Sequence, residues 1–523
     1  MFPPDSPYNG PPDRAMSMLH GRDVHYFVPP ATGAAARAAA AALNESDPGR
    51  YLKAMESSVT RDTESGVGID MREESDEMPR SEFPVVRKDP FTVLPPELMS
   101  LVLSFLDAPS LMSSELVCHR WHASASSRVA WKHCFIQEAH GASPIQVDKR
   151  HLLGNGIGKP FPDQNWKTLW MTRQALKQRW AESRAAAIYL EGHRDSVYCV
   201  QFDEHKIVTG SRDCTVRVWD SRTYECKYVL GVPSRNTSFS KPPLPSDLNI
   251  PPFRPMATIV STARDSDLTA LPSSLYHHRS ILCLQYDDDL MVTGSSDCTC
   301  IVWDVKAPYK PIRRLHNHTA GVLDICFDKK HIVTCSKDMT LCLWSRDTGE
   351  LLKKFIGHRG PVNAVQLRDD LVVSASGDGV AKLWSLSSGL CIKEFPSKDR
   401  GMACVDFSID SRTILAGGND QVIYQFDTTS GELVRELKGH KGLVRSLHLD
   451  CVNGRVVSGS YDHSVRAYDL KSGKNIVEFN SWTTSWILGA KSDYRRIVAA
   501  SQDSRVVVMD FGYQLPNVEL LEG

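Results

Sequence analysis

Seven copies of one short turn recur along the chain, and each copy ends in an aspartate. The residue before that aspartate changes from copy to copy, while the frame around it is kept. In order, this turn position holds Arg212, Ser296, Lys337, Gly377, Asn419, Tyr461 and Gln502. Arginine has forked donors that engage phosphate oxygens in pairs, and lysine adds a point charge. Cations at equivalent places in repeated units could therefore surround one opening and hold a phosphorylated or acidic peptide there.

A second variable position follows the apolar residue that begins the innermost strand of each unit. It holds Tyr198, Leu282, Leu323, Asn363, Ala403, Arg445 and Leu488. Neither position holds an acidic residue in any unit, although 62 of the 523 residues are Asp or Glu. We expect both sets of side chains, with the nearby Arg400, to face the same mouth of a central channel.

The spacing of the seven aspartates indicates the fold that carries these positions. The aspartates are Asp213, Asp297, Asp338, Asp378, Asp420, Asp462 and Asp503, and all gaps after the first lie between 40 and 42 residues. This period, with Gly-His upstream (as at 192–193) and Trp-Asp downstream (as at 219–220), resembles the WD repeat, which forms one four-stranded propeller blade. The resemblance predicts a mainly β fold, a seven-bladed propeller over residues 186–511, in which each aspartate bonds toward the histidine of its blade. His278 and His318 stand in partial versions of the histidine motif, and units five and seven lack it.

Two features of the propeller region depart from the simple repeat. The strand at 185–191 precedes the first unit and should supply the outermost strand of the last blade, which closes the ring without leaving an edge. The double-length first gap corresponds to an insertion at 231–275, whose Pro and Ser content predicts a loop rather than a blade. Residues 512–523 are expected to be a C-terminal tail.

A small helical region is predicted before the propeller. Apolar residues at 98, 101, 102, 105 and 106 have helical spacing, and a second short helix should carry apolar residues from 111 to 117, so that three short helices form a small core. Residues 89–135 resemble the F-box, with its Leu-Pro-x-Glu start at 94–97, the Leu-Asp pair at 106–107 and Val-Cys-x-x-Trp at 117–121. The resemblance implies that this segment docks on a Skp-type adaptor and, through the adaptor, joins the cullin and RING subunits of a ubiquitin ligase. The implied adaptor-binding residues are Leu94, Pro95, Glu97, Leu98, Leu101, Leu106, Val117 and Trp121. Residues 1–85 are predicted to be a disordered leader, and 163–185 a helical linker.

The order of motifs within the repeats is similar to that of the beta-transducin-repeat-containing (β-TrCP-like) F-box proteins. The similar elements include Val-Tyr-Cys at 197–199, Ser-Lys-Asp at 336–338 and Leu-Val-Arg at 443–445. That family holds doubly phosphorylated degrons, and the resemblance implies a substrate site at Tyr198, Arg212, Ser296, Leu323, Lys337, Asn363, Arg400, Gly401, Ala403, Leu443, Arg445 and Tyr461. The sequence departs from the family at Trp486, where the family has a contacting arginine, and in the 231–275 insertion.

Composition narrows the classes of function. The formal net charge of −1 gives no global attraction to nucleic acid or to an anionic membrane. The scattered cysteines and the absence of a signal-like apolar run predict a cytoplasmic or nuclear protein without cofactor or metal. No catalytic constellation stands outside the repeat frame, so we expect a non-catalytic receptor subunit that presents phosphorylated clients for ubiquitination and proteasomal degradation. The alternative is a propeller scaffold, bound to the adaptor or free, whose clients need no phosphate.

Overall fold

The computed structural model describes residues 89–140, 156–159, 163–233, 255–262, 275–306, 309–398 and 401–522. The chain divides into two units, Met1–Arg87 and Lys88–Gly523, and the described residues belong to the second. The predicted leader at 1–85 and the predicted site residue Arg400 lie outside the described residues. Within the described ranges, no helix combines the length and the apolar content that a bilayer crossing requires.

The region at 89–140 contains five helices rather than the three expected. They are α3 (Pro90–Val93), α4 (Pro96–Leu103), α5 (Ala108–Glu115), α6 (His119–Ala125) and α7 (Arg128–His140). One extra helix, α3, is capped by Asp89, which accepts the N–H of Phe91, and α5 ends early, at Glu115, so that α6 follows as a separate helix. The predicted second helix is therefore shorter than expected.

The core of this helical region is formed mainly by residues other than the predicted apolar stripe, of which only Leu106 packs against it. Met99 and Leu103 are buried on α4, and Leu103 belongs to one core cluster with buried Leu111, Trp131 and Phe135. The stripe residues on α4, Leu98, Leu101 and Val102, are exposed instead of being buried in this core.

Helix α8 (Trp166–Ala181) joins the helices to the propeller, and Asn165 caps its start by accepting the N–H of Thr168. At its other end the Trp180 ring stacks on Phe511 with 3.8 Å between centroids, and its indole N–H donates to the Tyr494 carbonyl. The segment expected to be a tail contains a 3₁₀ helix, η4 (Val518–Leu521), which packs against α8.

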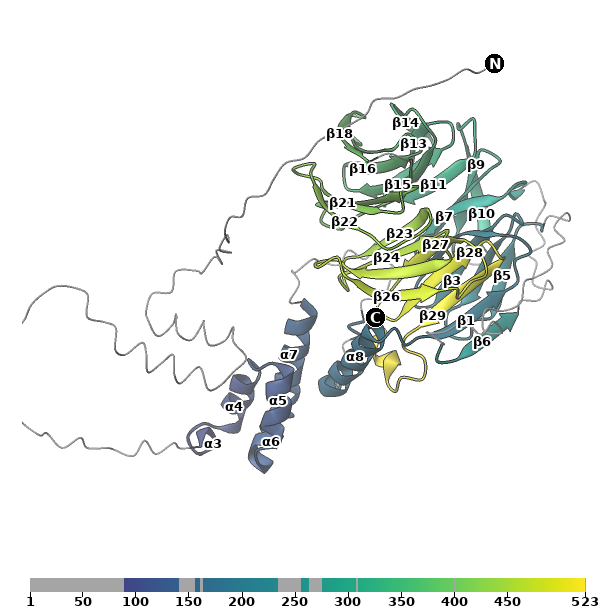
Figure 1. The fold of residues 1–523 in the computed structure, drawn as a ribbon. Coiled ribbons are helices and arrows are strands. Elements are labelled where there is room, and N and C mark those ends of the chain that lie inside the picture. Colours follow the sequence, from purple (N-terminus) through teal and green to yellow (C-terminus); the bar gives the residue numbers. More distant parts are fainter. Residues whose placement is uncertain are drawn as a thin grey trace, which may run out of the picture. The chain divides into compact units, whose positions relative to one another are not determined.

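The propeller has seven blades, as predicted, and each blade contains four antiparallel strands, the first of which lies innermost (Figure 1). Blade one contains β2 (Val197–Phe202), β3 (Lys206–Ser211), β4 (Val216–Asp220) and β5 (Cys226–Leu230). Blade two contains β7 (Ile281–Tyr286), β8 (Leu290–Ser295), β9 (Thr299–Asp304) and β10 (Lys310–His316). Blade three contains β11 (Val322–Phe327), β12 (His331–Ser336), β13 (Thr340–Ser345) and β14 (Leu351–Ile356).

Blade four contains β15 (Val362–Arg368), β16 (Leu371–Ser376), β17 (Val380–Ser385) and β18 (Cys391–Pro396). Blade five contains β19 (Met402–Phe407), β20 (Thr413–Gly418), β21 (Ile423–Asp427) and β22 (Leu433–Leu437). Blade six contains β23 (Val444–Asp450), β24 (Arg455–Ser460), β25 (Ser464–Asp469) and β26 (Asn475–Asn480). Each innermost strand contacts the innermost strand of the next blade, and β2 contacts the first strand of blade seven, which completes the ring.

Blade seven is built from both ends of the propeller sequence. It contains β27 (Ile487–Ser492), β28 (Arg496–Ser501), β29 (Arg505–Asp510) and β1 (Ala186–Glu191), and β1 pairs antiparallel with β29 as the closure prediction requires. The expectation that β1 is outermost is wrong, because β6 (Thr258–Thr262) pairs parallel with its free edge. The insertion at 231–275 is thus not only a loop. One of its segments covers the edge that β1 would otherwise expose.

Candidate functional site

A buried hydrogen-bond clamp shapes the turn of each blade that carries the first variable position. In blade one, Asp213 accepts from His193 Nδ1 at 3.0 Å and from the backbone N–H of Arg194 at 2.9 Å. His193 Nε2 lies 2.8 Å from the hydroxyl of Thr209, which also accepts from Trp219 Nε1 at 3.1 Å. Burial lowers the pKa of His193 and outweighs the attraction of Asp213, so the ring is neutral and its Nδ1 proton points to the carboxylate. The clamp holds the turn rigidly at the end of the blade.

The same clamp recurs in four more blades, which confirms the predicted aspartate–histidine bond. The pairs are His277–Asp297, His318–Asp338, His358–Asp378 and His440–Asp462, with Nδ1 to Oδ2 distances of 2.8 to 3.0 Å. In blade two the partner is His277 rather than the predicted His278, because His277 lies four residues before its inner strand, as His193 does. Blades five and seven replace the histidine by Tyr424 and Thr484.

The second variable position coincides with a β-bulge in every blade. The register between the first and second strands shifts by one residue at 198, 282, 323, 363, 403, 445 and 488. A bulge leaves its extra residue unpaired and re-aims the side chain. Six of the seven bulge residues accordingly line one channel cavity of about 110 Å³, namely Tyr198, Leu282, Leu323, Asn363, Arg445 and Leu488.

The turn position and the bulge position lie at the same edge of each blade. In all seven blades, the backbone N–H of the turn residue donates to the carbonyl of the residue that precedes the inner strand, as Arg212 does to Ser196 at 2.8 Å and Tyr461 to Leu443 at 2.9 Å. This carbonyl belongs to a third set of equivalent positions, which includes Gly401, Leu443 and Trp486. Three sets of variable residues thus meet at one channel mouth, which we call the mouth from here on.

At the mouth, a tyrosine of blade one comes under the electrostatic influence of an arginine of its own blade and of an arginine and a tyrosine of blade six. Burial raises the pKa of Tyr198, and the charge of Asp195 and the phenol of Tyr461 raise it further, while Arg212 and Arg445 lower it. The sequence reasoning missed Asp195, which lies outside both variable positions. Its buried carboxylate stands 3.7 Å from Arg212 Nε, yet the Arg212 side chain remains 55% exposed. Asp195 therefore orients Arg212 and leaves its outer end open to an anion.

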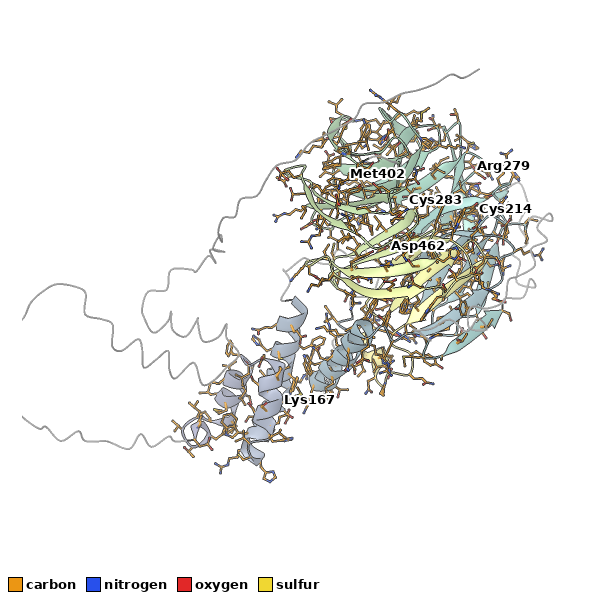
Figure 2. All side chains as sticks on the ribbon, viewed as in Figure 1. Lys167, Cys214, Arg279, Cys283, Met402 and Asp462 are labelled. Carbon is orange, nitrogen blue, oxygen red and sulfur yellow. The ribbon has the colours of Figure 1, made fainter. Side chains whose placement is uncertain are left out.

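The remaining predicted site residues take different places around the mouth. Lys337 is exposed at the turn of blade three, and Ser296 is half-buried at the turn of blade two. Asn363 donates to the Met402 carbonyl at 2.7 Å, and Arg445 donates to the Ala403 carbonyl at 3.3 Å, so both also join neighbouring blades. Figure 2 labels Met402 at the start of β19.

Gly401 has a structural reason to be glycine. A Cβ at this position would lie 2.8 Å from the carbonyl oxygen of Gly377, so the close approach of blades four and five depends on the missing side chain. Leu323 lines the channel beside Asp324, whose carboxylate accepts the N–H groups of Ile325 and Val365 at 2.9 Å. Burial raises the pKa of Asp324 to about 6, against the N–H donors and the charges of Lys491 and Arg445, which lower it.

A second candidate surface lies on the helices that precede the propeller. Leu98, Leu101 and Val102 are about half exposed on α4, and Phe105 and Leu116 are 69% and 87% exposed. Of the residues predicted for adaptor binding, Pro95, Glu97, Leu98, Leu101 and Val117 are exposed, whereas Leu94, Leu106 and Trp121 are half-buried. Leu106 and Trp121 pack on the helical core and support the surface from beneath. Exposed apolar residues grouped on so small a domain mark an interaction surface.

Neither surface has the donor set of a metal centre. Among the residues described, no group of three or more His, Cys, Asp and Glu could hold a metal ion. The histidines of the clamps are buried and bonded to aspartate and hydroxyl groups, which accounts for them without catalysis.

Comparison with known families matches both regions of the chain. The F-box-like family matches residues 91–137. The WD domain, G-beta repeat family matches residues 186–220, 270–304, 309–345, 349–385, 389–427 and 431–469. Strands β27, β28 and β29 of blade seven lie outside the matched repeats, while its strand β1 falls within the first matched segment.

Curated relatives share parts of this arrangement. A guanine nucleotide-binding protein subunit beta of Arabidopsis thaliana is 25% identical over 55% of this chain and 84% of its own length. The probable E3 ubiquitin ligase complex SCF subunit sconB of Arthroderma benhamiae is 32% identical over 27% of this chain, but the match spans only about a quarter of that relative. Among solved structures, the WD40 propeller domain of Doa1 is 20% identical, with a TM-score of 0.48, over 62% of this chain and 95% of that one.

An F-box-like segment and a complete propeller thus occur in one chain, in that order, and part of the chain is similar to SCF subunits. This chain is an F-box/WD-repeat protein.

Proposed function

We propose that the protein is the substrate-recognition subunit of a cullin-based SCF ubiquitin ligase, acting in the cytoplasm or nucleus. Its F-box helices bind a Skp-type adaptor, and through it the cullin and the RING subunit. The mouth binds a phosphorylated degron, so that the client is held for ubiquitination and degradation. The receptor is non-catalytic, and its contribution to the reaction is proximity.

The observation that carries this proposal is the pairing of two unlike surfaces on one chain. The F-box-like surface is apolar, with Phe105 and Leu116 the most exposed of its large side chains. The mouth carries Arg212, Lys337 and Arg445. Among the described ion pairs, one involves these residues, and it joins Arg212 to Asp195 at 3.7 Å. An adaptor fits the first surface through apolar burial, and a phosphate fits the second through charge-assisted hydrogen bonds.

The adaptor half is tested by pulldown of purified Skp-type adaptor and cullin with the full chain. Leu116→Glu places a charge on the most exposed apolar residue and should abolish adaptor capture without lowering the melting temperature. Ile356→Ala, on the outer strand β14 and 74% exposed, is the matched control that should capture normally. Capture of adaptor without cullin would instead favour a scaffold outside a ligase.

The phosphate half is tested by peptide binding with a pair of lysine variants. Lys329 and Lys337 are both exposed and stand at opposite ends of strand β12 in blade three. Lys337→Gln should weaken binding of a phosphoserine peptide, and Lys329→Gln should leave it unchanged. Arg445→Glu should abolish binding, but because Arg445 lines the same channel cavity as Asp324, Arg445→Gln is the safer variant for folding. Equal binding of phosphorylated and unphosphorylated peptide by the wild type would defeat the proposal for the mouth.

A further inference from the structure

The loop between β26 and β27 holds an exposed tryptophan in a fixed position at the mouth. Thr484 donates from its N–H and its hydroxyl to Asp503 Oδ2, at 3.1 and 2.8 Å. Ser485 donates to Gln502 Oε1 at 2.9 Å, and the carbonyl of Trp486 accepts the N–H of Gln502 at 3.0 Å. These bonds fix the backbone on the N-terminal side of Trp486, and β27 continues on the other side. The Trp486 ring is nevertheless 41% exposed, so the chain keeps a large apolar surface open at a rigid place.

A neighbouring blade supports this ring from one side. The Tyr461 ring lies parallel to Trp486, with 4.4 Å between centroids and 7° between planes. Tyr461 belongs to the clamped turn of blade six, directly before Asp462, which Figure 2 labels. Because the phenol covers one face of the indole, the exposed area of Trp486 is on the other face and the edge. A second flat group can stack there in the offset arrangement that aromatic rings favour.

The aromatic pair borders the cations of the mouth. Tyr198 and Arg445 line the same channel cavity, and Tyr461 stacks on Trp486. The Tyr198 phenol is also influenced electrostatically by Tyr461, Arg212 and Arg445. The turn positions of blades two, four and five hold Ser296, Gly377 and Asn419, which are neither charged nor aromatic. Apart from Lys337 on blade three, the cationic and aromatic residues described at these positions belong to blades six, seven and one.

We propose that Trp486 and Tyr461 form a subsite for a proline or aromatic side chain of the client, next to the phosphate held by Arg212 and Arg445. This inference rests on the proposed function and narrows its substrate class to peptides that combine one phosphorylated residue with one flat apolar residue. Rigid presentation matters here, because an indole that is already immobile loses little freedom when the client covers it. A proline or aromatic side chain of the client also loses less conformational entropy when it covers the indole than a long flexible side chain would.

The test uses the full chain and two positional-scanning peptide libraries, one with a fixed central phosphoserine and one with serine. Binding is read by fluorescence polarisation. The wild type should prefer proline or aromatic residues at one position of the phosphoserine library by about three- to tenfold. Trp486→Ala should lose this preference and keep the dependence on phosphate, whereas Trp486→Phe should retain both. Ile356→Ala is again the control for an exposed apolar residue far from the mouth. Trp486→Arg should replace the preference for a flat residue with one for an acidic residue.

The outcomes separate this inference from the proposed function. If binding needs phosphate but Trp486→Ala leaves the residue preferences unchanged, the aromatic subsite is refuted and the phosphodegron proposal stands. If the serine library shows the same preference for flat residues with equal affinity, the subsite is supported and the phosphate proposal fails. If neither library binds, both proposals are overturned.

Discussion

The buried hydroxyl of each clamp predicts that one kind of substitution has different effects in two blades. In blade four, Ser374 Oγ lies 2.7 Å from His358 Nε2 and 2.9 Å from Trp384 Nε1. Burial lowers the pKa of His358, and its Nδ1 proton is directed at Asp378 2.8 Å away, so Nε2 must accept. The hydroxyl therefore donates to the histidine and accepts from the indole. Ser374→Ala leaves both of these buried groups without a partner.

Blade six offers the matched comparison. Ser458 Oγ lies 2.7 Å from His440 Nε2, but Tyr468 occupies the place of the tryptophan, and no hydrogen bond is described between its hydroxyl and Ser458. Ser458→Ala therefore orphans one group where Ser374→Ala orphans two, and both serines are fully buried. A buried polar group left unsatisfied costs about 1–3 kcal/mol. We expect the free energy of unfolding to fall by about 1–3 kcal/mol in Ser458→Ala and by about 2–6 kcal/mol in Ser374→Ala.

Urea unfolding of the full chain measures both losses. Tryptophan fluorescence and far-ultraviolet circular dichroism should be followed together, because coincident transitions are needed before free energies are compared in a protein of this size. A double-mutant cycle with Trp384→Phe sharpens the test, since Ser374→Ala should cost less once the indole N–H is gone. Equal losses in blades four and six, or additive losses in the cycle, would refute the assigned direction of the hydrogen bonds.

Three further predictions concern the channel, blade five and blade seven. The pKa of Asp324 is about 6 in the folded protein, above its ordinary value of 3.8, so its contribution to stability falls as pH rises from about 4 to 6. The difference in unfolding free energy between wild type and Asp324→Asn should therefore change across that window by about 2–3 kcal/mol. A flat difference would contradict the burial of this carboxylate. Tyr424→Phe removes the hydroxyl that donates to Asp420 at 2.5 Å in place of the missing histidine, and the free energy of unfolding in urea should fall by about 1–3 kcal/mol. An unchanged free energy of unfolding would mean that the tyrosine does not substitute for the histidine. Ile259→Asp should detach β6 from β1, so that limited proteolysis cuts within 255–262 while the melting temperature of the propeller changes little; a cooperative loss of the whole fold would show that β6 is integral to the ring.

Much of the fold could be predicted from the sequence because repetition multiplies a weak signal. One aspartate in a turn indicates little, but seven at a nearly constant period fix the number of blades. The variable positions were found for the same reason, since the bulge recurs at 198, 282, 323 and the equivalent residues. In blade two the sequence pattern predicts His278 instead of His277, because Tyr276 stands where the motif usually has its glycine.

The parts that could not be predicted depend on contacts between distant segments. Strand β6 has a short, partly exposed sequence, its partner β1 lies about 70 residues earlier, and the sheet that both join is completed only by the last strands of the chain. Asp195 stands outside the variable positions, and only the folded turn brings it beside Arg212. The apolar stripe on α4 has the same spacing whether it faces a core or a partner, and the burial of Met99 and Leu103 decides between the two.

The way blade seven closes also matters while the chain is being made. Glu191 of β1 pairs with Arg505 of β29, and 314 residues separate them. At a synthesis rate of about 5–20 residues per second, β1 leaves the ribosome roughly 15 to 60 seconds before its partner exists. During that time its free edges are available to chaperones or to other nascent chains. A ribosome that stops early would release a product with the F-box-like helices complete and the ring open. Under the proposed function, such a product would occupy adaptor while presenting no finished client site.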